Sequence, residues 1–124
     1  AEVLSAADAA RALGPETVLV TSVVHDEAVE GTIDMIAVTG EGAWSVTTPL
    51  LPRTFTGAGD LTAATFLAHL LSSGSVPQAV GRTAAVVYGV LEITVESGLS
   101  ELQLVAAQDE IAAPTNAFEV VRLR

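Results

Sequence analysis

Short apolar runs separated by glycine- and proline-containing breaks predict the order of elements along the chain. Residues 17–24 are apolar and rich in β-branched side chains without strict alternation, which favours a strand buried on both faces. Residues 32–38 and 43–47 are two further strand candidates, and the short glycine-containing break between them predicts a β-hairpin. Residues 102–105 are the candidate for a last strand.

The pattern also predicts three helices. Ser5 and Asp8 form an acidic capping box ahead of residues 9–13, and Gly14 ends that helix. Residues 61–71 carry apolar side chains on nearly every side of a helix, so we expect this helix to be largely buried.

A second capping box, formed by Ser75 and Gln78, starts a helix that we expect to run to about Val95. Residues 25–31 are polar and acidic and predict a solvated turn. The order helix, strand, hairpin, helix, helix, strand indicates a layered α/β fold. The three or four strands are an incomplete set for a doubly wound sheet, which usually has five or six.

Composition limits what such a fold can be. The chain has 124 residues, half of them hydrophobic but only 4 % aromatic, so Ala, Val, Leu and Ile must build the core. The length suits one domain or one piece of a larger domain. No apolar run reaches the roughly 18 residues that a membrane-spanning helix needs. The chain begins without Met, which fits a piece of a longer protein and equally fits tag removal or Met processing.

Charge and missing residue types exclude several chemistries. Five basic residues, all arginine, stand against 15 acidic ones, giving a net charge of −10. Without lysine there can be no Schiff base and no lysine-dependent phosphate loop, and without cysteine no thiolate nucleophile or thiolate zinc site. The acidic balance argues against binding to nucleic acid or to an anionic membrane.

Residues 54–62, which read Thr-Phe-Thr-Gly-Ala-Gly-Asp-Leu-Thr, are the segment that carries candidate chemistry. Two glycines separated by one small residue allow the backbone to approach a ligand, and the N–H groups at the start of the following helix can bind an anion without lysine. Asp60 lies in the same turn and has two interpretations. It either caps the helix, a common role for Asp, or acts as a general base beside bound phosphoryl oxygens.

Residues 55–62 resemble the glycine-turn signature of the ribokinase-like superfamily. Residues 18–23, 44–51 and 101–114 make the resemblance narrower, to the C-terminal half of pyridoxal (vitamin B6) kinases. The segment 101–114 is the most distinctive, because sugar kinases of the superfamily share the glycine turn but not this ending. The resemblance implies that residues 1–124 are the C-terminal portion of one kinase domain with a three-layer α/β/α fold, without its N-terminal half.

The resemblance also implies roles for individual residues. Asp60 would be the catalytic base that activates the 5′-hydroxyl of pyridoxal, and it would contact this substrate. Gly57, Ala58 and Gly59 would form the anion hole at the helix start. The residues that match nucleotide-contacting positions of the family are Thr21, Thr48, Pro49, Leu50 and Leu51.

The implied activity is ATP-dependent phosphorylation of pyridoxal to pyridoxal 5′-phosphate, with Mg²⁺, in a cytoplasmic protein that is a homodimer when complete. The contacts to the substrate ring and to Mg²⁺ belong to the family's first half, so we expect no metal ligand here and no activity of this chain alone. Two alternatives stay open. One is another ribokinase-like kinase, acting on a hydroxymethylpyrimidine or a sugar, and the other is a fragment without catalytic function.

Overall fold

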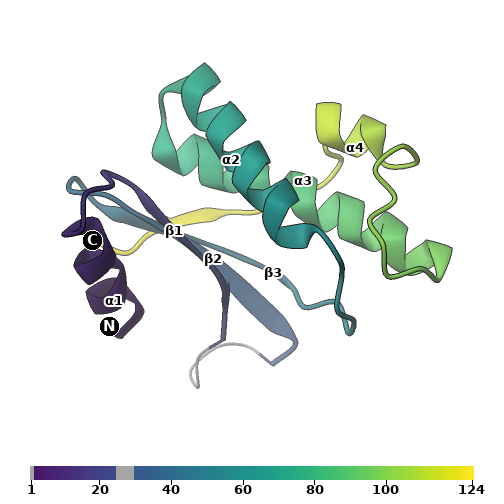
Figure 1. Ribbon diagram of the computed structural model, residues 1–124, viewed down its shortest axis with the longest axis horizontal. Helices are drawn as coiled ribbons and strands as arrows, with labels where there is room; N and C mark the ends of the chain where they lie inside the picture. Colours follow the sequence, from purple (N-terminus) through teal and green to yellow (C-terminus); the bar gives the residue numbers. More distant parts are fainter. Residues whose placement is uncertain (1, 25–29) are drawn as a thin grey trace.

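The chain folds around a four-stranded antiparallel sheet in the order β1-β2-β3-β4. The structure, a computed structural model, describes residues 2–24 and 30–124 (Figure 1). The strands are β1 (Val18–Val23), β2 (Thr32–Val38), β3 (Ala43–Pro49) and β4 (Val120–Arg122). The predicted hairpin is confirmed, since β2 and β3 pair from Val38 with Ala43 at the turn to Thr32 with Pro49 at the open end.

Helices cover both faces of the sheet (Figure 1). The first helix, α1 (Glu2–Arg11), packs on one face, and the antiparallel pair α2 (Ala58–Ser73) and α3 (Val76–Ser97) packs on the other. Side chains of β2 alternate between the two cores: Ala37 packs towards α2 and α3, whereas Ile36 and Val38 pack towards α1. This arrangement confirms the predicted layers of helix, sheet and helix.

The predicted start and end of α3 are confirmed. The Ser75 hydroxyl accepts a hydrogen bond from the amide of Gln78 at 3.3 Å, and Gly98 closes the helix in a left-handed conformation with φ 77°. A short helix, α4 (Gln108–Ala112), then packs beside α3. At this contact Gly89 leaves room for Glu110, because a Cβ there would lie 3.1 Å from the glutamate side chain.

Two predictions for the first half of the chain are wrong. Ser5 does not cap a helix but lies inside α1, which begins at Glu2 because Val3 and Leu4 pack against the sheet. The strand β1 is not buried on both faces, since only Val23 is buried within it. It is an edge strand of the sheet and pairs with β2. The predicted turn at residues 25–31, which includes His25, lies mostly outside the described residues.

Two predictions for the second half are also wrong. Helix α2 is buried on one side only, through Thr62, Thr65 and Phe66, while Leu67 and Leu71 are 55 % and 76 % exposed. Residues 102–105 form no strand, and the last strand is β4 instead.

The place of β4 depends on a glycine far away in sequence. It pairs with the outer edge of β3, from Trp44 with Arg122 to Val46 with Val120. Val120 also packs on α3 at Gly81, where a Cβ would lie only 2.9 Å from its Cγ2. No helix of the described residues combines the length and apolar character that crossing a bilayer requires.

Candidate functional site

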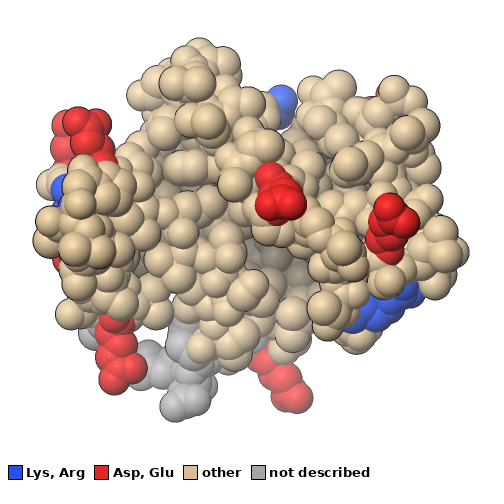
Figure 2. Space-filling model, viewed as in Figure 1, with Lys and Arg blue, Asp and Glu red and all other residues tan. Residues whose placement is uncertain are grey.

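A pocket of about 400 Å³ lies where the start of α2 and the middle of α3 face the ends of β1, β2 and β3. The loop from β3 to α2 forms its remaining wall. On the face shown in Figure 2, most of the surface is uncharged. The residues that line the pocket are Thr21, Ser22, Ile33, Asp34, Met35, Thr48, Pro49, Leu50, Leu51, Arg53, Thr54, Phe55, Ala58, Gly59, Thr62, Ala84, Val87, Tyr88 and Leu91.

The start of α2 lies in this pocket without a side-chain cap. The N-cap residue is Gly57, in a left-handed conformation with φ 92°, and its carbonyl accepts the first helical hydrogen bond from Leu61 at 3.0 Å. The N–H groups of Ala58, Gly59 and Asp60 have no acceptor within the helix, as in the first turn of any helix. A Cβ on Gly59 would meet no atom within 4 Å, so the backbone is open to a ligand here. The turn can therefore donate hydrogen bonds to an anion.

Asp60 is the third residue of α2 and is exposed beside the pocket. It does not line the pocket itself, but its neighbours Ala58 and Gly59 do. Among the described residues, its carboxylate forms no hydrogen bond and no ion pair. The capping position belongs to Gly57, so the structure gives no support to the interpretation of Asp60 as a cap. An uncommitted carboxylate beside free amides can accept a proton from a group bound at the turn.

The five residues predicted to contact nucleotide all line the same pocket. Thr21 lies near the end of β1, and residues 48–51 lead from β3 into the loop. Pairing of β1 with β2 is interrupted between Val20 and Val23, and Ser22 in this bulge has a positive φ of 57°. The bulge turns the end of β1 towards the pocket, which brings Thr21 and Ser22 to its rim. Of the nine predicted site residues, only Gly57 and Asp60 flank the pocket instead of lining it.

Helix α3 supplies a wall that the sequence analysis did not assign to the site. Ala84, Val87, Tyr88 and Leu91 recur at helical spacing and give this wall an apolar surface. The Tyr88 ring packs edge-on against Phe118, with 5.4 Å between ring centroids. Periodicity showed only that this face of α3 is apolar, and it could not show that part of the face borders a cavity.

The Tyr88 hydroxyl is held in its neutral form. It donates a hydrogen bond to Glu92 at 3.3 Å. Burial raises the pKa of Tyr88 above its usual 10.0, and the negative charge of Glu92 raises it further. The hydroxyl is therefore a hydrogen-bond group at neutral pH and not a source of negative charge in the pocket.

Asp34 is the acidic residue that lines the pocket, and it is hydrogen-bonded to the neighbouring strand β3. It is only 9 % exposed, and its Oδ1 accepts a hydrogen bond from the Thr47 hydroxyl at 2.6 Å. The two residues are direct partners in the β2–β3 register. Within the residues that the structure describes, no three His, Cys, Asp or Glu side chains gather as a metal site.

The sequence is similar to bacterial pyridoxal kinases. No family model matches the chain. It is 52 % identical to the pyridoxal kinase PdxY of Rubrobacter xylanophilus, over 97 % of this chain and 42 % of that protein. It is 48 % identical to the pyridoxal kinase PdxY of Leifsonia xyli, with the same coverage of both. The chain thus spans about two fifths of the length of the curated relatives that it matches.

Solved structures share the fold. A pyridoxal kinase from Leishmania donovani in complex with ADP and pyridoxine superposes with a TM-score of 0.84 at 22 % identity, covering 96 % of this chain and 43 % of the other. A protein from Bacteroides thetaiotaomicron described as a putative phosphomethylpyrimidine kinase superposes with a TM-score of 0.84 at 21 % identity, covering 98 % and 43 %. The chain therefore has the fold of part of a ribokinase-like kinase, as expected from the glycine turn.

Proposed function

The chain is homologous to about two fifths of a pyridoxal kinase, and from this premise we propose that it carries the phosphoryl-transfer half of such an enzyme. The complete protein would transfer the γ-phosphoryl group of ATP to the 5′-hydroxyl of pyridoxal, giving pyridoxal 5′-phosphate and ADP. The observation that carries this proposal is the uncapped start of α2, which opens into the pocket lined by the predicted nucleotide-contacting residues.

Asp60 acts as the general base in this proposal. Its carboxylate takes the proton of the 5′-hydroxyl while the hydroxyl oxygen forms a bond to the γ-phosphorus. The bond from that phosphorus to the bridging oxygen of ADP breaks at the same time, and ADP leaves with the electron pair. An exposed carboxylate without a partner in the described chain is free to accept this proton.

The first turn of α2 supplies charge stabilisation. The amides that follow Gly57 donate hydrogen bonds to the transferring phosphoryl oxygens, and the positive end of the helix dipole favours the charge that collects there. Gly59 keeps the approach open. Donors that are fixed in a helix need no rearrangement as the reaction proceeds. Such positioning is the main contribution of a protein to the rate of phosphoryl transfer.

The strand ends and the loop hold the nucleotide in this proposal. Thr21 and Thr48 supply hydroxyl groups, while Pro49, Leu50 and Leu51 supply apolar surface. The wall of α3 closes the other side. This combination of an apolar pocket with a few polar groups is typical of sites for ligands such as a nucleoside.

Mg²⁺ would neutralise the phosphate charge during transfer. The side chains of the described residues do not fit a resident magnesium site. The pocket's carboxylate, Asp34, is engaged by Thr47, and the described residues hold no cluster of ligands. We therefore assign no Mg²⁺ ligand here and place those ligands in the remainder of the kinase.

A second candidate is phosphorylation of a hydroxymethylpyrimidine. The fold does not separate the two candidates, because the putative phosphomethylpyrimidine kinase and a pyridoxal kinase superpose equally well, whereas the sequence similarity to pyridoxal kinases favours the first. Assay of the complete protein with ATP and each of pyridoxal, pyridoxamine, pyridoxine and hydroxymethylpyrimidine separates the two. We expect ADP formation with pyridoxal and a product phosphorylated at the 5′ position. Phosphorylation of the pyrimidine alone would overturn the first candidate.

We also propose that the complete enzyme is a cytoplasmic homodimer that binds neither nucleic acid nor membrane, and that this chain alone is inactive. The net charge of −10 supports the two expected absences. Light scattering of the purified complete protein tests the dimer, and cell fractionation tests the compartment. Turnover by the isolated chain would contradict its expected inactivity.

A further inference from the structure

The loop that carries the glycine turn is fastened to the segment that follows α3. Nη2 of Arg53 donates a hydrogen bond to the carbonyl of Leu99. The amide of Thr56 donates to the carbonyl of Ser100 at 3.1 Å, and Thr56 forms a parallel β-bridge with Glu101. These contacts join residues 53–56 to residues 99–101 just before α2 begins.

Residues 99–102, which we call the platform, are in turn fixed to the end of α3. The amide of Leu99 donates to the Ser97 hydroxyl at 3.2 Å. Directly after the platform, the amide of Gln103 donates to the hydroxyl of Thr94 at 3.2 Å. Thr94 is fully buried, and its hydroxyl donates to the carbonyl of Val90 at 2.8 Å. The platform is therefore held at both ends by the same helix that walls the pocket.

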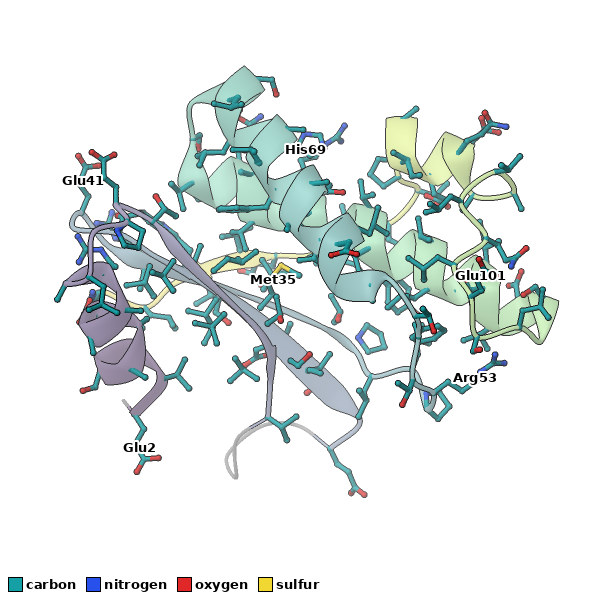
Figure 3. The ribbon with its side chains drawn as sticks, in the orientation of Figure 1. Glu2, Met35, Glu41, Arg53, His69 and Glu101 are labelled. Carbon is teal, nitrogen blue, oxygen red and sulfur yellow. The ribbon has the colours of Figure 1, made fainter. Side chains whose placement is uncertain are left out.

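The platform also lies against the N-cap of α2. A Cβ on Gly57 would lie 3.7 Å from Cδ1 of Leu102, which is ordinary van der Waals contact. The first residue of the turn thus rests on the Leu102 side chain, while Arg53 holds the loop from its other end. Figure 3 shows Arg53 beside the β3–α2 loop, on the same side of the molecule as Glu101.

We propose that Arg53 is a positioning residue. Its hydrogen bond to the carbonyl of Leu99, which we call the clasp, fixes the amides of the glycine turn relative to the α3 wall. The proposal rests on the proposed function of the turn. Arg53 lines the pocket, but its structural partner is a backbone carbonyl of the platform. Arginine suits this task, because a planar guanidinium offers five donors in a fixed geometry. Leu102 contributes to the same positioning without any charge.

The test compares Arg53→Met, Leu102→Ala and their double variant in the complete kinase, with Arg82→Met as the control. Arg82 is an exposed arginine of α3 outside the pocket, so this control removes the same charge without touching the clasp. We expect Arg53→Met to lower kcat about 10- to 100-fold while KM for ATP changes less than about threefold, because a small misplacement of the donors weakens the transition state more than the bound state. Leu102→Ala should lower kcat in the same direction.

The losses should be less than additive in the double variant, because both act on the position of one turn. If Arg53→Met instead raises KM for ATP at unchanged kcat, and Leu102→Ala matches the wild type, Arg53 contacts the nucleotide directly and the proposal is wrong.

Hydrogen exchange of the Thr56 amide tests the clasp without using activity. We expect Arg53→Met to speed this exchange by about tenfold or more, because local opening governs amide protection. Unchanged protection would overturn the clasp. A wild-type protein that fails to phosphorylate any substrate would refute the proposed function, and the exchange measurement would still decide the role of Arg53.

Discussion

Helices α2 and α3 lie side by side, but their first turns are built differently. At the start of α3 the Ser75 hydroxyl accepts a hydrogen bond from Gln78, and Pro77 removes one more free N–H from that turn. At the start of α2 the N-cap is Gly57, which has no side chain, and no cap hydrogen bond is formed. The comparison shows that a side chain caps α3, whereas the backbone amides at the start of α2 are left open beside the pocket. In the proposed function these open amides bind the phosphoryl oxygens.

The largest effect that would test this contrast is expected at Asp60. Asp60→Asn keeps the size of the side chain and removes the base, so kcat should fall by about 10²–10⁴-fold, the usual contribution of a general base. The melting temperature and the affinity for ATP should stay unchanged. Steady-state kinetics of the complete protein measure kcat, and calorimetry measures the melting temperature and the affinity for ATP. Asp109→Asn, in the first turn of α4, is the matched control, and near wild-type turnover of Asp60→Asn would refute the assignment.

Substitutions of Gly59 and Gly81 compare a glycine that leaves space for a proposed ligand with a glycine that leaves space for packing. A Cβ on Gly59 meets nothing, so Gly59→Ala should leave the melting temperature unchanged or slightly raised. The same methyl group would narrow the anion site and lower kcat/KM on the order of tenfold.

Gly81→Ala should do the reverse. Its Cβ would lie 2.9 Å from Cγ2 of Val120, so we expect about 1–3 kcal/mol of destabilisation and little change in kinetics. Denaturant unfolding and initial-rate assays of both variants give the comparison. If Gly59→Ala is unstable and catalytically normal, the open turn is a structural feature and not a binding site.

The cap of α3 should affect stability alone. Ser75→Ala removes the acceptor for the Gln78 amide and should cost about 1 kcal/mol of unfolding free energy. Both kinetic constants should be unchanged, because Ser75 is not part of the pocket lining. Ser72→Ala, an exposed serine at the end of α2, is the control and should have a smaller effect. A fall in kcat after Ser75→Ala would show that the two helix starts are coupled.

The smallest effect is expected at the surface pair of Asp8 and Arg124. The two guanidinium nitrogens Nη1 and Nη2 donate to the Asp8 carboxylate at 2.7 and 2.6 Å. The hydrogen bond from Arg124 lowers the pKa of Asp8 below 3.8. A lowered folded pKa adds stability above the unfolded value, and this stability is lost as the pH falls through the folded one.

Because solvent screens this exposed pair, Asp8→Asn should lower the melting temperature only slightly at neutral pH, by about a degree or less. The difference from the wild type should disappear in strongly acidic solution. Thermal melts recorded from neutral to acidic pH measure it. A difference that persists at the lowest pH would mean that Asp8 stabilises the fold by some means other than its charge.

Local signals in the sequence predicted those parts of the fold that local interactions decide. The break at Gly40 and Gly42 predicted the β2–β3 hairpin, and Ser75 predicted the start of α3, because turn and cap preferences act within a few residues. The strand expected at residues 102–105 was wrong for the opposite reason. Any strand needs a partner, and the open edge of β3 is taken by β4, which the room at Gly81 allows to approach.

The candidate site divides in the same way. The glycine turn could be proposed from residue type and spacing. The role of Asp60 as a base came from the resemblance to pyridoxal kinases, because spacing alone left a helix cap as an alternative. The clasp between Arg53 and Leu99 could not be predicted, since it joins residues 46 positions apart through a backbone carbonyl that no sequence pattern marks. The left-handed Ser22 was missed as well, because Ser has no preference for that conformation, and only the register of β1 against β2 shows it.

The open start of α2 has a consequence for how the site responds to its surroundings. Its donors are backbone amides, which have no titration near physiological pH and no reactive amine. A lysine at the same place would lose its charge near pH 10 and could be acetylated. A site made of amides keeps its donors in alkaline solution and is untouched by amine-modifying reagents. In a chain without lysine, this part of the site cannot be switched off by those chemical routes.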